Sequence, residues 1–234
     1  MKPLALTQLA KLAALAIATS LTATAASAAI IISEVDAAGS ATSTYAADWF
    51  ELTNTGSSAV SLSGWKIDDN SNAFGSAVAL RGVTSLGAGQ SAVFIESNSS
   101  GSNDASIDAA FIQAWFGSSA PAGLLIGNYG GSGVGLSQTS DAVNVFNSAG
   151  TLITRVDFNA SVLGNTFDNA AGLNNAVIST FSAVGVHGAF LSANGVEVGS
   201  PGTIAAVPEP ASLALVLTSL GVIALGGKRR RQGN

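Results

Sequence analysis

The sequence predicts an all-β fold, an antiparallel β-sandwich with one or two short helices, on three observations. Between residues 29 and 206, apolar residues alternate with polar ones more than they follow a helical period. Gly, Ser and Asn separate these short alternating segments, as they do in turns. One stretch carries apolar residues at helical spacing instead. Many short strands joined by such turns are typical of a sandwich.

The segment DWFELTN, residues 48–54, predicts a strand. Successive side chains of a strand point to opposite faces, so Phe50 and Leu52 face away from Trp49 and Glu51. We expect the first pair to enter the core.

Residues 60–67, VSLSGWKI, predict a strand with a break. Leu62 is in step with Val60, and the apolar series resumes one residue out of register at Trp65 and Ile67. Gly64 is therefore predicted to form a bulge or bend. A turn through Gly87 and Gly89 then precedes a strand over residues 92–96.

A helix is predicted after the cluster Ser102, Asn103 and Asp104, which are good N-capping residues. Ile107, Phe111 and Trp115 follow at four-residue spacing, which gives the helix one apolar face.

Residues 141–158 predict a β-hairpin with its turn at residues 147–150. Its apolar side chains are expected to line one face: Val143, Val145, Leu152, Val156 and Phe158.

Residues 1–28 have the features of a secretory signal peptide. Lys2 and Lys11 are followed by an Ala/Leu-rich stretch and by Ala26 and Ala28, which flank one small residue in a cleavage pattern. The alternative is a first membrane anchor, but the apolar core at residues 12–21 is too short to cross a bilayer. We therefore expect Sec-type export and a mature chain starting near residue 29. Residues 29–206 are expected to form one domain, with two small domains as the less favoured division.

The charge is divided unevenly along the chain. Outside the two ends, the body has three basic residues, Lys66, Arg81 and Arg155, against thirteen acidic ones. An acidic surface repels phosphate backbones, which argues against a nucleic-acid-binding protein and is compatible with divalent cations or a basic partner. The chain has no cysteine, so disulfide-rich folds and thiolate metal sites are excluded.

The C-terminal end predicts a membrane helix over residues 211–227, because this uncharged run would span roughly 25 Å as a helix. Four cations follow it and place the C-terminus on the cytoplasmic side: Lys228, Arg229, Arg230 and Arg231. Before the run, Pro208 and Pro210 flank Glu209 and favour an extended peptide at the outer membrane face. A plain single-pass anchor is the alternative.

The order Pro-Glu-Pro, apolar span and Arg-rich end over residues 207–231 resembles the PEP-CTERM sorting signal of Gram-negative bacteria. The resemblance implies recognition by an exosortase-type membrane protease or transpeptidase. It also implies transient anchoring in the inner membrane, and then a place at the cell surface or in an extracellular matrix linked to exopolysaccharide and biofilm.

A second resemblance is carried by IIISEVDAAGS and by DWFELTNTGSSAVSLSGWKIDD, and extends more weakly to GSPGTI, over roughly residues 30–204. These segments resemble the lamin tail domain, which implies an immunoglobulin-like sandwich. The residues that match the family's structural positions are Glu34, Trp49, Glu51, Asn54, Gly64 and Trp65. The chain departs from the family pattern by extra Gly/Ser/Asn-rich stretches near residues 97–104 and 117–140, and no catalytic domain is attached.

Candidate chemistry is sparse, and no residue is assigned a catalytic role. His187, the single histidine, has no nucleophile-elbow serine to complete a triad and is interpreted as a loop residue. Glu34 and Glu51 on neighbouring strands could approach each other as glycosidase carboxylates do. We favour the interpretation that they lie on the solvent face or hold loops through backbone bonds.

Two loops complete the candidates. The turn DDNSN contains Asp68 and Asp69, whose carboxylates could bind calcium. The favoured interpretation is that these residues form an Asp/Asn-rich turn through side-chain bonds to the backbone. The glycines around Gly130 lack the lysine and the spacing of a phosphate-binding loop and predict a flexible loop. No cofactor is assigned beyond this calcium hypothesis. We expect an exported, non-enzymatic surface or matrix protein; the alternatives are a calcium-dependent glycan-binding module and, less favoured, a hydrolase using acidic residues.

Overall fold

The computed structural model describes residues 30–118 and 120–203, which belong to the compact unit Ser27–Val207. The predicted signal peptide and the predicted sorting tail, with its membrane helix at 211–227, lie outside the described residues. Among the described helices, none is long and apolar enough to cross a membrane.

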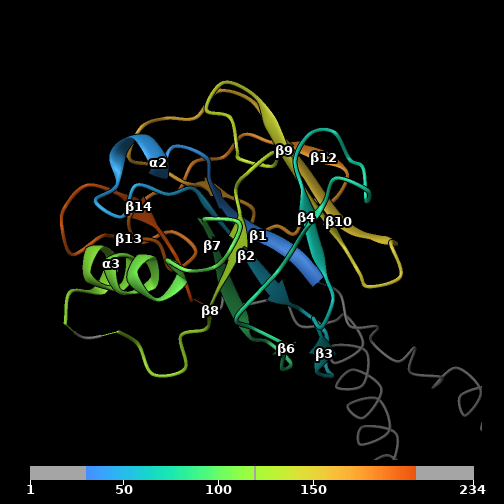
Figure 1. Ribbon diagram of the computed structural model, residues 1–234. Coiled ribbons are helices and arrows are strands. Elements are labelled where there is room, and N and C mark those ends of the chain that lie inside the picture. The colour runs from blue at the N-terminus through green and yellow to red at the C-terminus, as the bar shows by residue number, and fades with distance from the viewer. Residues whose placement is uncertain (1–29, 119, 204–234) are drawn as a thin grey trace, which may run out of the picture. The chain divides into compact units, whose positions relative to one another are not determined.

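Two five-stranded sheets form the domain (Figure 1). The first has the order β11-β1-β2-β7-β8. Its strands are β1 (Ile30–Asp36), β2 (Trp49–Asn54), β7 (Ser91–Ser97), β8 (Ile126–Gly130) and β11 (Phe167–Asp168). The second has the order β12-β10-β9-β4-β5. Its strands are β4 (Lys66–Asp68), β5 (Val78–Ala79), β9 (Asp141–Phe146), β10 (Leu152–Phe158) and β12 (Ala176–Ile178).

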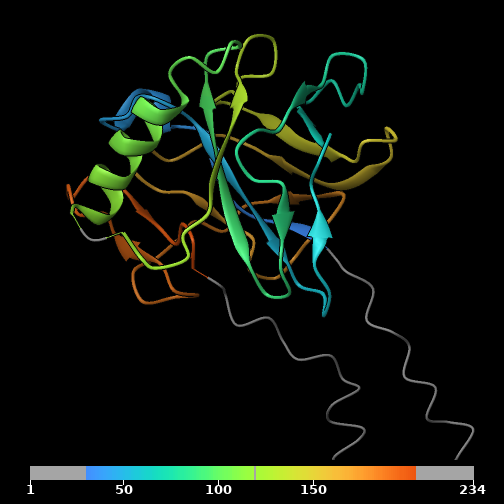
Figure 2. The same cartoon turned by 60° about the horizontal axis from the view of Figure 1, so that its bottom comes forward.

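Smaller elements complete the domain. Two ladders of two strands each are formed by β3 (Val60–Ser61) with β6 (Ser85–Leu86), and by β13 (Phe190–Leu191) with β14 (Val198–Gly199). The helices are α2 (Gly39–Thr42) and α3 (Asp104–Phe116). Figure 2 shows α3 lying beside the first sheet, away from the hairpin of β9 and β10.

The sheets are mixed rather than purely antiparallel, which corrects the prediction. β7 pairs with β8 in parallel, and β10 pairs with β12 in parallel. The first pair is parallel because the chain between its strands crosses over through α3, as parallel neighbours require. The sandwich class and the presence of two short helices are confirmed.

The main core lies between the two sheets, and a second apolar cluster lies between the first sheet and α3. Phe50 and Leu52 enter the main core as predicted, while Trp49 packs against Phe111 and Trp115 of the helix. Both faces of β2 are therefore buried.

The predicted bend at Gly64 is confirmed, because this residue has φ of 75° in the turn that leads from β3 to β4. Trp65 and Ile67 then enter the core. The hairpin of β9 and β10 is also confirmed, with one correction: a bulge between Leu152 and Thr154 shifts the register, and Ile153 packs against the core where Leu152 was expected.

Two local predictions need correction. Asn103 is the N-cap residue of α3 as the sequence indicated, but its side chain makes no capping hydrogen bond; its Oδ1 accepts a hydrogen bond from the backbone N–H of Asn98, the residue after β7. The segment around Gly130 is not a flexible loop in its first half, because residues 126–130 form the buried strand β8. Parallel pairing with β7 satisfies its backbone, a contact that the local sequence does not reveal.

Candidate functional site

Glu34 and Glu51 lie directly opposite each other on β1 and β2, and each is 1% exposed. A register shift between Ile32 and Glu34 places Ser33 as an extra residue, and this bulge turns Glu34 to the face that Glu51 occupies. The prediction that these acids are neighbours is confirmed. Of the two alternatives in the favoured interpretation, the solvent-facing position is excluded, because the C-terminal segment of the described chain covers both acids.

The carboxylate of Glu34 is held by donors from that covering segment and from the chain before β11. Its Oε1 accepts hydrogen bonds from Thr166 Oγ1 at 2.5 Å and from the backbone N–H of Ser200 at 2.7 Å. Its Oε2 accepts one from Ser200 Oγ at 3.0 Å. Glu34 therefore holds a loop, as the favoured sequence interpretation stated.

Glu51 is held in the same way. Its Oε1 accepts a hydrogen bond from Ser33 Oγ at 2.7 Å, and its Oε2 accepts one from the backbone N–H of Gly202 at 2.6 Å. Both oxygens of each acid are thus occupied by donors of the same chain. The glycosidic bond of a polysaccharide cannot reach either carboxylate in this arrangement.

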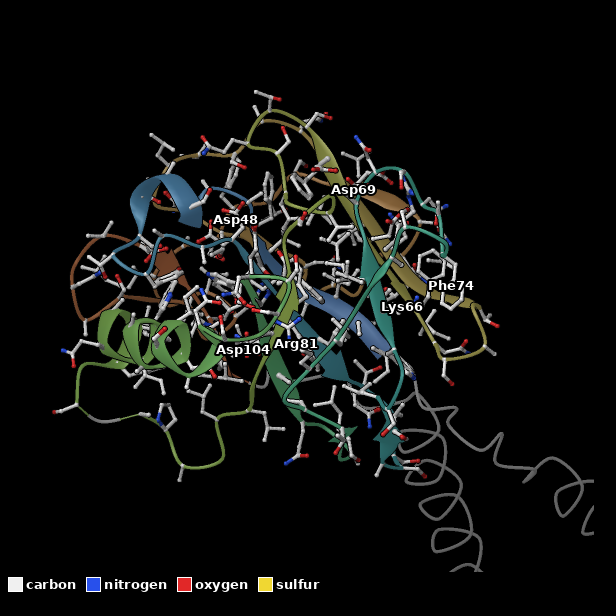
Figure 3. The ribbon with its side chains drawn as sticks, viewed as in Figure 1. Asp48, Lys66, Asp69, Phe74, Arg81 and Asp104 are labelled. Atoms are coloured by element: carbon white, nitrogen blue, oxygen red, sulfur yellow. The ribbon has the colours of Figure 1, made fainter. Side chains whose placement is uncertain are left out.

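Burial raises the pKa of both acids. The pKa of Glu34 rises to about 7, mainly through desolvation, and that of Glu51 rises to about 8, through desolvation and then the charge of Glu34. The cations of the described chain contact other groups. Figure 3 shows Arg81 beside Asp104 and Lys66 beside Phe74, and Arg155 pairs with Asp157.

A second acid pair lies on the same flank. Tyr45 donates its hydroxyl to Glu197 Oε1 at 2.8 Å and accepts the indole N–H groups of Trp49 and Trp115 at 3.0 and 3.2 Å. Glu197 Oε2 is buried without a hydrogen-bond partner among the described residues, and the charge of Glu197 acts on Asp36. Burial first, and then the charge of Glu197, raises the pKa of Asp36 well above its ordinary value.

Buried acids change the interpretation of the charge. Seven of the thirteen body acids are buried: Glu34, Asp36, Asp48, Glu51, Asp68, Asp141 and Glu197. The sequence analysis therefore overestimated how many acidic residues lie on the surface, because many of them lie inside the domain. Sequence reasoning missed the roles of Tyr45, Asp36 and Glu197. One sequence pattern could have indicated these buried acids: acidic residues at alternate positions within apolar strand segments that contain no basic residue.

The other residues that match the family's structural positions make the following contacts. Asn54 donates its side-chain amide to the carbonyls of Ser58, Leu86 and Gly87, which joins the end of β2 to the loop before β3 and to the end of β6. Trp49 and Trp65 lie in the two apolar clusters. His187 lies in a turn with φ of 46°, and its Nδ1 is 2.6 Å from Asp168 Oδ2.

Asp68 holds its own loop. Its Oδ2 accepts hydrogen bonds from Ser71 Oγ and the backbone N–H of Ala73, both at 2.6 Å, and its Oδ1 accepts one from Ser76 Oγ at 2.9 Å. Asp69, labelled in Figure 3, is the next residue and begins the loop after β4. Over residues 30–118 and 120–203, no group of three or more acidic or histidine side chains could hold a metal ion. Calcium binding at Asp68 and Asp69 stays a prediction.

The profile of the lamin tail domain matches residues 23–160, more than half of the chain. The chain belongs to the lamin tail domain family. The match ends near β10, short of the residue 204 expected from the sequence, so the segment that covers Glu34 and Glu51 lies outside the matched part of this lamin tail domain. A search of curated proteins found no match. Lamin tail domains are typically non-catalytic, and this suggests a structural or binding module.

Proposed function

We propose that the chain is an exported, non-enzymatic surface protein whose lamin tail domain has a structural or binding role in the extracellular matrix. One observation carries the non-enzymatic part: the carboxylates best suited to hydrolysis, Glu34 and Glu51, are 1% exposed and have their oxygens bound by donors of the domain itself. Catalytic acids must reach a substrate, and these acids serve the fold instead.

The sorting part of the proposal rests on the two ends of the sequence. Residues 1–28 direct export through the Sec machinery, and residues 207–231 carry the Pro-Glu-Pro motif, the apolar span and the basic end. In this proposal an exosortase-type enzyme in the inner membrane cuts near Pro208–Pro210. The domain then passes to the cell surface or to an exopolysaccharide-rich matrix.

The experiment is an intact-mass measurement on protein from fractionated Gram-negative cells and medium. The expected mass corresponds to a chain starting at Ala29 and ending near residue 210, recovered from the surface or matrix fraction. Glu209→Ala should abolish this product, and Ser212→Ala, just outside the motif, should leave it unchanged. A mass that includes Arg231, confined to the inner membrane in every version, would refute sorting and leave an ordinary membrane anchor.

The non-enzymatic part has its own test. We expect no turnover of polysaccharide or nucleic acid by the purified protein across a broad substrate panel. Turnover that is lost in a folded Glu34→Gln or Glu51→Gln variant would overturn this part without affecting the sorting result.

A further inference from the structure

The last described segment, Val198–Thr203, is attached to the domain in two different ways. Its first part joins backbone ladders: β14 pairs with β13, and the N–H of Val198 bonds to the carbonyl of Gly164 at 2.8 Å. Its second part, Ser200–Gly202, contains Pro201, which has no N–H to donate. The hydrogen bonds that this part donates to the first sheet go to Glu34 and Glu51.

The close fit at this junction depends on Gly199. A β-carbon at this position would lie 2.6 Å from Glu34 Oε1 and 2.9 Å from the ring of Trp115. The segment therefore lies directly on the buried carboxylate, with no space for water between the glycine and the acid.

The groups facing the pair are mostly acidic. Glu34 and Glu51 face each other, and Asp168 of β11 adds a third carboxylate, which pairs with His187 on its exposed side. Beyond Trp115, Tyr45 hydrogen-bonds to Glu197, whose charge acts on Asp36. The described lysine and arginines contact Phe74, Asp104 and Asp157 instead.

We propose that Glu34 and Glu51 form a proton-controlled latch for Ser200–Gly202: the segment is docked while the pair holds a proton, and detaches when both carboxylates are ionised. With one proton on the pair, a single negative charge is stabilised by the hydroxyl and N–H donors around it. With both ionised, two adjacent buried charges repel each other, and detachment of the segment lets water reach them.

The sign of the pH effect follows from the same geometry. The docked state holds the pKa values of the pair above that of an exposed glutamate, at about 7 and 8. A proton is therefore bound more tightly when the latch is closed, and removing it by raising the pH favours the open state. Opening is expected between about pH 6 and pH 9.

The experiment is hydrogen–deuterium exchange on the full-length chain in detergent at pH 6 and pH 9, after correction for the intrinsic pH dependence of amide exchange. Protection of the peptide spanning residues 198–203 should fall at least about tenfold, the factor that corresponds to one pKa unit. In Glu51→Gln, which keeps the size of the side chain and cannot ionise, only Glu34 still loses its proton, so the fall should be at least about tenfold smaller than in the unaltered chain.

Glu96→Gln is the matched control. Burial raises the pKa of Glu96 to about 7 as well, but its carboxylate lies beside Gly131, whereas Ser200 and Gly202 bond to Glu34 and Glu51. This variant should keep the full pH response of residues 198–203.

Three results would overturn the latch. The first is equal protection of residues 198–203 at the two pH values in the unaltered chain. The second is an undiminished response in Glu51→Gln, or in Glu34→Gln if circular dichroism shows that Glu51→Gln is unfolded. The third is an equal loss of protection in β1 and β2, which would show global unfolding. None of these results depends on whether the tail is processed.

Discussion

Gly199 lies against the carboxylate of Glu34 so closely that a β-carbon would come within 2.6 Å of Oε1. The relationship joins the last described strand to the first one, across most of the domain sequence. A glycine is therefore needed at position 199 because no side chain fits there, and not because of a turn.

Gly199→Ala should therefore destabilise the domain by about 1–3 kcal/mol, the usual cost of overpacking a filled site. Gly75→Ala is the control, because a β-carbon there meets nothing within 4 Å. Thermal unfolding of both variants is the measurement. Equal melting temperatures would contradict the close packing at Gly199.

The domain should lose stability as the pH rises from about 6 to about 9, the reverse of ordinary acid denaturation. The pKa values of Glu34, Glu51 and Glu96 rise on folding from 4.5 to about 7, 8 and 7. Their contribution is fully present below the unfolded value near 4.5 and is lost as the pH passes through the folded values. Melting temperatures measured across this range check the sign, and a rise toward pH 9 would refute it.

Tyr45→Phe should cost about 1–3 kcal/mol, because it removes the donor to Glu197 and the acceptor of two buried indole N–H groups. Tyr129→Phe is the matched control. Its hydroxyl is buried without a hydrogen-bond partner in the described structure, so its removal should be neutral or stabilising. Denaturant titration of the two variants should separate them, and similar losses would count against the assigned role of Tyr45.

Asp68→Asn should destabilise the loop after β4 by about 1–2 kcal/mol. Both carboxylate oxygens of Asp68 accept hydrogen bonds, and the amide nitrogen that replaces one of them in Asn cannot accept any. The loss should be the same in calcium and in chelator if the loop is held by its own donors. Calcium-dependent stabilisation of the unaltered chain that disappears in Asp68→Asn would instead support the calcium hypothesis.

Local patterns predicted the strands well where side-chain alternation and burial agree. Phe50 and Leu52 could be assigned to the core from alternation, and Gly64 could be assigned to a bend because the apolar series changes register there. The parallel partner of β7 could not be predicted, since it depends on a crossover through α3 and on no local signal.

The site was predictable only in part. The proximity of Glu34 and Glu51 follows from neighbouring strands, but their burial depends on residues 198–202, nearly 150 positions beyond Glu51 in the chain. The role of Tyr45 likewise depends on Glu197. Alternation identifies the face to which a side chain points and does not identify the distant segment that covers that face.

The short ladder of β13 and β14 also determines how the domain responds to force. A pull on the chain beyond Thr203 acts on a segment held by the hydrogen bonds to Glu34 and Glu51, by a two-residue ladder with β13 and by one bridge to Asn165, whereas β1 is flanked on both sides by strands of a five-stranded sheet. The small ladder should therefore separate first, and residues 190–203 would extend while both large sheets remain folded. A domain pulled by its C-terminal end would thus have an extensible segment that takes up load before the sandwich opens.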